Sequence, residues 1–121
     1  MALISQRHLR LLAFCSFLIL LAALFIGGHQ PASGRLFPPP WDKAVHFTFY
    51  GILTIVAGLA FPKMRISLLS VMIIAIGGTD EIHQIFVPGR HPGLDDLAAD
   101  AIGCLPALLL VFWLRTKLAP T

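Results

Sequence analysis

The amino-acid sequence predicts an all-α integral membrane protein, a four-helix bundle that forms a single domain over residues 1–121. Three observations lead to this fold class. The chain is 57% hydrophobic and only 12% charged, about half the charged fraction of a typical soluble domain. It contains four apolar segments, each close to the roughly 20 residues that a helix needs to cross a bilayer. Its charged residues are also divided by sign between the two ends of these segments.

The expected membrane spans cover residues 11–27, 44–61, 66–86 and 96–114. The first span carries no charge, and the second is interrupted only by His46 and hydroxyl groups. The third is apolar to Ile76 and then carries Asp80 and Glu81, while the fourth contains Asp100. In lipid such spans must be helical, because the backbone has no other hydrogen-bond partner, and they lack the alternation of barrel strands. A signal peptide is the alternative for the first span, and its cleavage stays open.

The nine basic residues divide unequally across a four-span arrangement. Six lie on one side, namely Arg7, Arg10, Lys63, Arg65, Arg115 and Lys117. Three lie on the other side, namely Arg35, Lys43 and Arg90. The positive-inside rule places the side with six in the cytoplasm, so both termini are expected there. Basic residues at these helix ends suit anchoring to anionic lipid, and the sequence predicts no nucleic-acid partner.

The acidic residues show the opposite bias. All six fall toward the expected outer face: Asp42, Asp80, Glu81, Asp95, Asp96 and Asp100. A charge at the centre of a bilayer costs about 2.5–3.5 kcal/mol, and less toward its edge. Carboxylates within apolar spans are therefore tolerated only where they point into the bundle and are hydrated, paired or protonated.

Helical spacing supports an inward polar face near the outer ends of three spans. His46 lies four residues after Asp42, and Asp100 lies four residues after Asp96, so each pair shares one face of its helix. Arg90 lies in the connection between the last two spans, beside the acidic residues. We therefore expect one polar pocket on the outer side, with Arg90 as its principal cation.

Three segments, WDKAVHFTFYGILT, TDEIHQIFVPGR and DDLAADAIG, resemble the VanZ family, which is known from a protein linked to teicoplanin resistance in bacteria. The resemblance covers about residues 41–107. Its motif positions are Asp42, Lys43, His46, Asp80, Glu81, Gln84, Arg90, Asp96 and Gly103. Asp100 stands where many members carry Asn. The resemblance implies a multi-pass protein of the bacterial cytoplasmic membrane with a role in the cell envelope, and it implies no particular reaction.

The first functional hypothesis is a protein that binds, or acts on, an anionic or lipid-linked envelope molecule at the outer face. Its catalytic candidates, which would transfer protons, are His46, Asp80 and Glu81. Its substrate-binding candidates are Asp42, Lys43, Gln84, Arg90, Asp96 and Asp100. Arg90 and Lys43 would hold phosphate or carboxylate, since a guanidinium suits bidentate binding of an oxyanion. Whether the protein is an enzyme stays open.

Two other hypotheses use the same residues. The charged cluster of a non-catalytic membrane scaffold would form an ion network that specifies helix packing. An intramembrane acidic cluster can also serve a proton or cation pathway, but the inner halves of all four spans are apolar, which argues against one.

No metal ligand is assigned from the sequence, and the cofactor is unknown. A zinc or harder divalent ion bound by His46, His83, Asp80 and Glu81 is a special case of the first hypothesis. The chain has no tight ligand signature such as HExxH to support it. The expected partners are membrane lipid and the envelope molecule, and the sequence does not indicate an oligomeric state.

The topology is testable by cysteine labelling from outside the cell. A cysteine placed at Ser33 should react with a membrane-impermeant reagent, because the connection after the first span is expected outside. A cysteine at Met64 should be protected. Labelling at position 64 with protection at position 33 would invert the arrangement.

Overall fold

The computed structural model describes residues 4–30 and 36–118, and these residues form helices and no strand. Ser33 and Arg35, which bear on the topology, lie outside the described residues. The elements are α1 (Gln6–Ala22), the short π-helix η1 (Ala23–Gly27), α2 (Trp41–Ala60), α3 (Ile66–Ile85) and α4 (Leu94–Leu118). Four helical segments, the first made of α1 and η1 together, are long and apolar enough to cross a membrane. The predicted all-α class with four membrane-spanning helices is confirmed.

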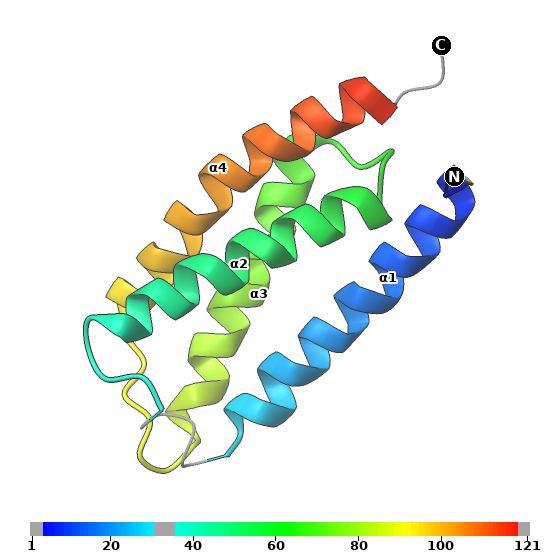
Figure 1. Cartoon of the computed structure of the whole chain (residues 1–121). Coiled ribbons are helices and arrows are strands. Elements are labelled where there is room, and N and C mark those ends of the chain that lie inside the picture. Colours follow the sequence, from blue (N-terminus) through cyan, green and yellow to red (C-terminus); the bar gives the residue numbers. More distant parts are fainter. Residues whose placement is uncertain (1–3, 31–35, 119–121) are drawn as a thin grey trace.

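Helix α2 lies at the centre of the bundle (Figure 1). It packs most extensively against α4 and also contacts α1 and α3. Helices α2 and α4 begin at the same end, where α3 finishes, and we call this the polar end. At the opposite end, called the basic end, the start of α1 meets the finish of α4, and Gln6 Nε2 donates a hydrogen bond to the Leu118 carbonyl at 3.1 Å. Helices α2 and α4 therefore run parallel, while α1 and α3 run the other way.

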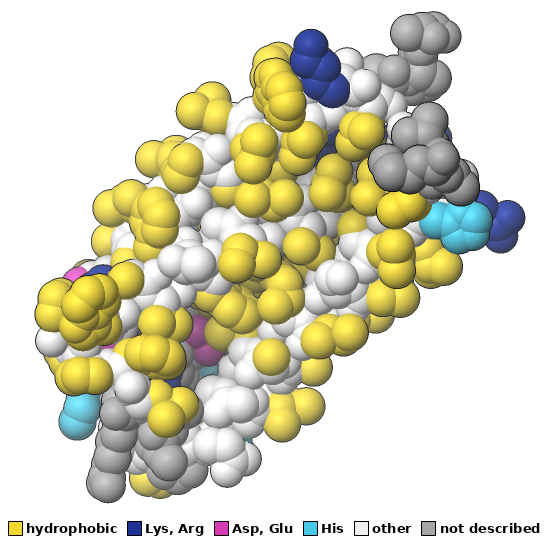
Figure 2. Space-filling view, in the orientation of Figure 1, with side chains coloured by type: hydrophobic (Ala, Val, Ile, Leu, Met, Phe, Trp, Pro, Cys, Tyr) yellow, Lys and Arg dark blue, Asp and Glu magenta, His cyan; other side chains and the backbone are white. Residues whose placement is uncertain are grey.

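The face of the bundle seen in Figure 2 is largely apolar along its length. Large hydrophobic side chains such as Leu105, Leu109 and Phe112 are more than half exposed. Several carboxylates are buried instead, among them Asp80 and Asp100. This distribution is the reverse of a soluble domain, and it suits a protein whose outer surface contacts lipid.

Glycine allows the backbones of α2 and α4 to come into contact. A Cβ added to Gly103 would overlap the backbone carbonyl of Phe47, and one added to Gly51 would lie 3.3 Å from the Gly103 carbonyl oxygen. Gly77 of α3 has a similar role, because its Cβ would lie 3.1 Å from Asp100 Oδ2. Its neighbour Gly78 has nothing within 4 Å of an added Cβ. Small residues at such crossings are typical of membrane helix packing.

Arg115 of α4 caps the end of α2. Its guanidinium donates to the carbonyls of Gly58 at 2.9 Å, Phe61 at 3.0 Å and Met64 at 2.6 Å. The last carbonyls of a helix have no partner within it, so Arg115 supplies donors to carbonyls at and just beyond the end of α2. In the sequence analysis, Arg115 was only one of the six basic residues that predict cytoplasmic termini. The structure adds a packing role between α4 and α2.

Replacing Gly103 with alanine should destabilise the bundle, because the new methyl group meets the backbone of α2, which cannot rotate away. We expect a loss of about 1–3 kcal/mol, the range for overpacked cores, measured by thermal unfolding in detergent. The matched control is Gly78→Ala on α3, which should be neutral or stabilising by up to about 1 kcal/mol, since alanine favours helix. Equal effects of the two substitutions would contradict the close approach of α2 and α4.

Candidate functional site

The candidate site lies at the polar end, where the first turns of α2 and α4 meet the last turns of α3. On α2, His46 lies three residues after Lys43, and both side chains face α4. On α4, Asp100 lies four residues after Asp96, and both side chains face α2. Because the two helices run parallel, their polar residues pair in sequence order, Lys43 with Asp96 and then His46 with Asp100.

Lys43 joins the first turns of the two helices. Its ammonium donates to Asp42 Oδ2 and Asp95 Oδ2, each at 3.0 Å, and also to Asp96 Oδ1. An ammonium has three N–H donors, and here three carboxylates accept them. The donors of Lys43 therefore have acceptors within the protein, and Lys43 holds the start of α2 against the start of α4.

His46 forms the next contact, one turn further into the bundle. Its Nδ1 lies 2.7 Å from Asp100 Oδ1, and Asp100 is almost fully buried. The ring of Tyr50, one further turn along α2, stacks against the His46 ring at an interplanar angle of 13°. On α3, Glu81 Oε2 accepts a hydrogen bond of 3.1 Å from the backbone N–H of Gly93, just before α4.

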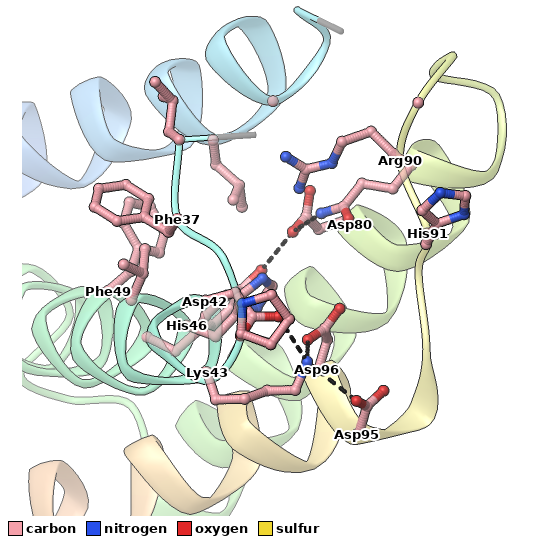
Figure 3. Close-up of a pocket in the computed structure, with 18 of the residues that line it drawn as sticks. Phe37, Asp42, Lys43, His46, Phe49, Asp80, Arg90, His91, Asp95 and Asp96 are labelled. Carbon is pink, nitrogen blue, oxygen red and sulfur yellow. Dashed lines mark hydrogen bonds and ion pairs between the residues drawn. The ribbon is translucent and has the colours of Figure 1, made fainter. Parts of the chain in front are cut away.

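Asp80 is the most enclosed carboxylate of the site. It is 0% exposed, and its Oδ2 accepts hydrogen bonds from the Tyr50 hydroxyl at 3.3 Å and from Gln84 Nε2 at 2.9 Å. Its other oxygen, Oδ1, accepts no hydrogen bond from the described residues. Arg90 extends from the connection between α3 and α4 toward Asp80 (Figure 3).

A partly open cavity of about 530 Å³ lies between these groups. Seven of the nine residues proposed for the site line it: Asp42, Lys43, His46, Asp80, Gln84, Arg90 and Asp96. Glu81 and Asp100 are outside its lining. The rest of the wall includes apolar side chains, namely Leu24, Leu36, Phe37, Val45 and Phe49. The cavity therefore combines charged groups with a hydrophobic side.

Some features of the site were not found from the sequence. Tyr50 was not among the proposed site residues, although it lies four residues after His46 and shares its helical face. Asp95 was counted among the acids but not included in the site. His83 stacks on His29, with His29 Nδ1 3.3 Å from His83 Nε2, and it is not part of the cluster around His46. The structure therefore does not form the four-residue metal site considered from the sequence.

The residues of the three sequence motifs thus occupy one end of a four-helix membrane bundle. The chain matches the family described as VanZ/LLP1 over residues 5–115. The protein belongs to the VanZ/LLP1 family. Comparison with curated proteins and with solved structures found no significant match. The family match of this VanZ/LLP1 protein includes all of α1, which the motifs found in the sequence did not reach, and it extends through most of α4.

Proposed function

We propose that this VanZ/LLP1 protein binds an anionic, lipid-linked molecule of the bacterial cell envelope in the cavity at the polar end. The polar end would face the outer side of the cytoplasmic membrane, with both termini in the cytoplasm, as the distribution of basic residues predicts. A role in resistance to glycopeptides would follow from altering or withholding such a molecule.

The observation that carries the proposal is a single cavity that has both Arg90 and an apolar wall. Its volume of about 530 Å³ lies within the range of small-molecule sites. A guanidinium can hold a phosphate or carboxylate through two parallel hydrogen bonds. Leu36 and Phe37 offer a hydrophobic surface to the lipid portion of the same ligand.

The contacts of the site refine the roles predicted from the sequence. Lys43 has three carboxylate acceptors, so we give it a positioning role. We assign the ligand's oxyanion to Arg90, because Arg90 lines the cavity and its planar guanidinium suits an oxyanion. His46 and Asp80 line the cavity and are the groups through which a proton could be exchanged with a bound ligand. Glu81 is outside the lining, which makes it a weaker candidate for direct chemistry.

The second candidate is a scaffold whose charges serve only helix packing. The pairing of Lys43 with three carboxylates favours it, because such a network specifies the register between α2 and α4. A proton or cation pathway has less support. The described core toward the basic end is formed mainly by apolar residues, among them Leu53, Ala57, Leu69, Ile73 and Val111.

The proposal is tested by expressing the protein in a teicoplanin-susceptible bacterium. The wild type should raise the teicoplanin concentration needed to inhibit growth, and Arg90→Ala should return it to the host value. Loss of a charged hydrogen-bonding contact costs about 1.5–3 kcal/mol, which is a ten- to hundredfold loss of affinity. The control is Lys117→Ala, an exposed basic residue at the basic end, which should keep the wild-type effect.

Membrane content and thermal unfolding separate the two candidates. If Arg90 binds a ligand, Arg90→Ala should accumulate at the wild-type level and unfold at nearly the same temperature. In a packing network, removing Arg90 would leave Asp80 less compensated, so the variant would be depleted from the membrane. Recovery of both the amount and the resistance in the double variant Arg90→Ala/Asp80→Asn would refute the binding proposal.

A further inference from the structure

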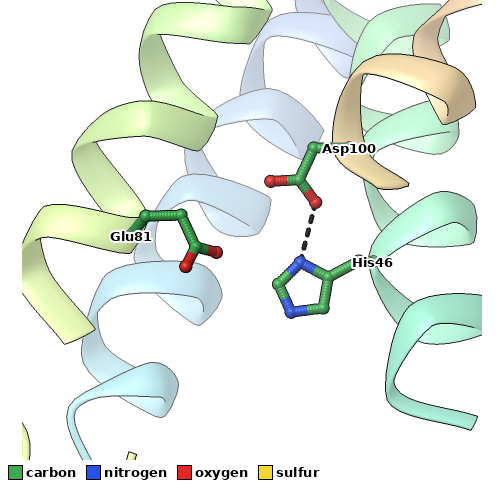
Figure 4. Close-up of side chains that lie close together, drawn as sticks. All are labelled: His46, Glu81 and Asp100. Carbon is green, nitrogen blue, oxygen red and sulfur yellow. Dashed lines mark hydrogen bonds and ion pairs between the residues drawn. The ribbon is translucent and has the colours of Figure 1, made fainter. Parts of the chain in front are cut away.

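We propose that His46, Glu81 and Asp100 form a binding site for one divalent transition-metal ion, of the Zn²⁺ or Mn²⁺ type. The three residues come from α2, α3 and α4, so the ion would link three helices (Figure 4). The proposal concerns the bundle itself and does not depend on the identity of any envelope ligand.

The geometry of the three side chains is the first observation. One ligand atom from each lies within 4.8 Å of those from the other two. Ligand atoms bound to a single such ion, each at about 2.0–2.2 Å, lie roughly 3–3.5 Å from one another. Small side-chain rotations would therefore bring all three atoms to bonding distance.

Two carboxylate oxygens without partners are the second observation. Glu81 is 9% exposed and Asp100 is 1% exposed, yet Glu81 Oε1 and Asp100 Oδ2 accept no hydrogen bond from the described residues. Buried polar atoms are nearly always paired, because an unpaired one loses its hydration without compensation. The two carboxyl groups face the space beside the His46 ring (Figure 4), where an ion would satisfy both free oxygens.

The other oxygen of each carboxylate is already held. Gly93 N–H donates to Glu81 Oε2, and Asp100 Oδ1 is paired with His46 Nδ1. The Gly93 contact fixes the orientation of the Glu81 carboxyl group before any ion arrives, as outer-shell hydrogen bonds do in metal sites. The His46–Asp100 contact holds two of the proposed ligands side by side. The site is thus arranged in advance on three packed helices rather than on a loop.

The donor set indicates the class of ion. One imidazole nitrogen and two carboxylate oxygens suit zinc, manganese and their neighbours, whereas calcium and magnesium favour oxygen alone. With three protein ligands, at least one coordination position stays open for water or another ligand. His46 also lines the cavity, so an ion bound there would lie beside it. The ion's charge would offset two buried carboxylates.

The test is a titration of the full-length protein, purified in lipid nanodiscs and freed of metal by chelation. Zn²⁺ binding followed by calorimetry should show one site per chain. Glu81→Gln and Asp100→Asn should each weaken it at least tenfold, because each removes one ligand while keeping the side-chain shape. Acidification should weaken it too, since protons compete for all three ligands.

Two control variants test the location of the site. Asp95→Asn removes an exposed carboxylate at the same end, and His83→Asn removes the imidazole pair formed with His29. Both should keep the wild-type affinity within about twofold, within the additivity expected of separate sites. Loss of binding in His83→Asn, with binding retained in Glu81→Gln, would overturn the proposal.

A measurement on the wild-type protein tests the metal site even if a variant does not fold. Mn²⁺ bound to the unaltered protein should show nitrogen coupling from one imidazole in pulsed electron paramagnetic resonance. The signal should disappear when Zn²⁺ is added in excess, because both ions would occupy one site. Absence of bound Mn²⁺ and Zn²⁺ at millimolar concentration, or bound Mn²⁺ without nitrogen coupling, would refute the site.

Discussion

The close approach of α2 and α4 is the constraint on which the rest of the structure depends. Gly103 lies against the backbone of Phe47, and no larger residue could occupy its position without moving one helix. Phe47 directly follows His46, and Gly103 lies three residues after Asp100. Once this contact is set, the helical repeat brings His46 to Asp100. One turn earlier, it also brings Lys43 to the start of α4.

The parallel direction of these two helices also explains where the acids are. The first turns of α2 and α4 lie together, and each carries acidic residues, Asp42 in one and Asp95 and Asp96 in the other. The amino end of a helix has a partial positive charge, so carboxylates are stabilised there. Lys43 adds a full positive charge among the three carboxylates that surround it. An apolar bundle can therefore hold an acidic cluster, provided that it stays at this end.

Much of the fold followed from the sequence because bilayer physics leaves few choices. Apolar spans of the right length must be helices, and acidic residues within them must face inward. The spacing of His46 after Asp42, and of Asp100 after Asp96, identified the polar face of each helix. Spacing within one helix, however, does not say which residue of a neighbouring helix it meets.

That limit accounts for the parts of the site that the sequence did not reveal. The sequence included Lys43 among the cations for a ligand, but its three carboxylate partners come from residues in two helices. His83 shares a helical face with Asp80, yet it stacks on His29, which follows η1. Gly77 and Gly78 are equivalent in sequence, and only Gly77 lies against another helix. Each outcome depends on the relative rotation of two helices, which periodicity does not determine.

The polar end contains two arrangements that share His46. On one side, His46 lines the cavity together with Arg90 and the apolar side chains of the wall. On the other, it lies close to Asp100 of α4 and Glu81 of α3, both of which are buried. His46 would couple ligand binding in the cavity to helix packing, because a movement of its ring would disturb its contact with Asp100 of α4.

The central claim is that the contact of α2 with α4 assembles the site, and solid-state nuclear magnetic resonance tests it most directly. The metal-free protein in lipid, labelled with ¹⁵N in histidine and ¹³C in aspartate, should show strong dipolar coupling between His46 Nδ1 and the Asp100 carboxyl carbon. This is expected for a nitrogen 2.7 Å from a carboxylate oxygen. The coupling should weaken in Gly103→Ala and persist in Gly78→Ala. Its absence from the wild type, or its full retention in folded Gly103→Ala protein, would contradict the account.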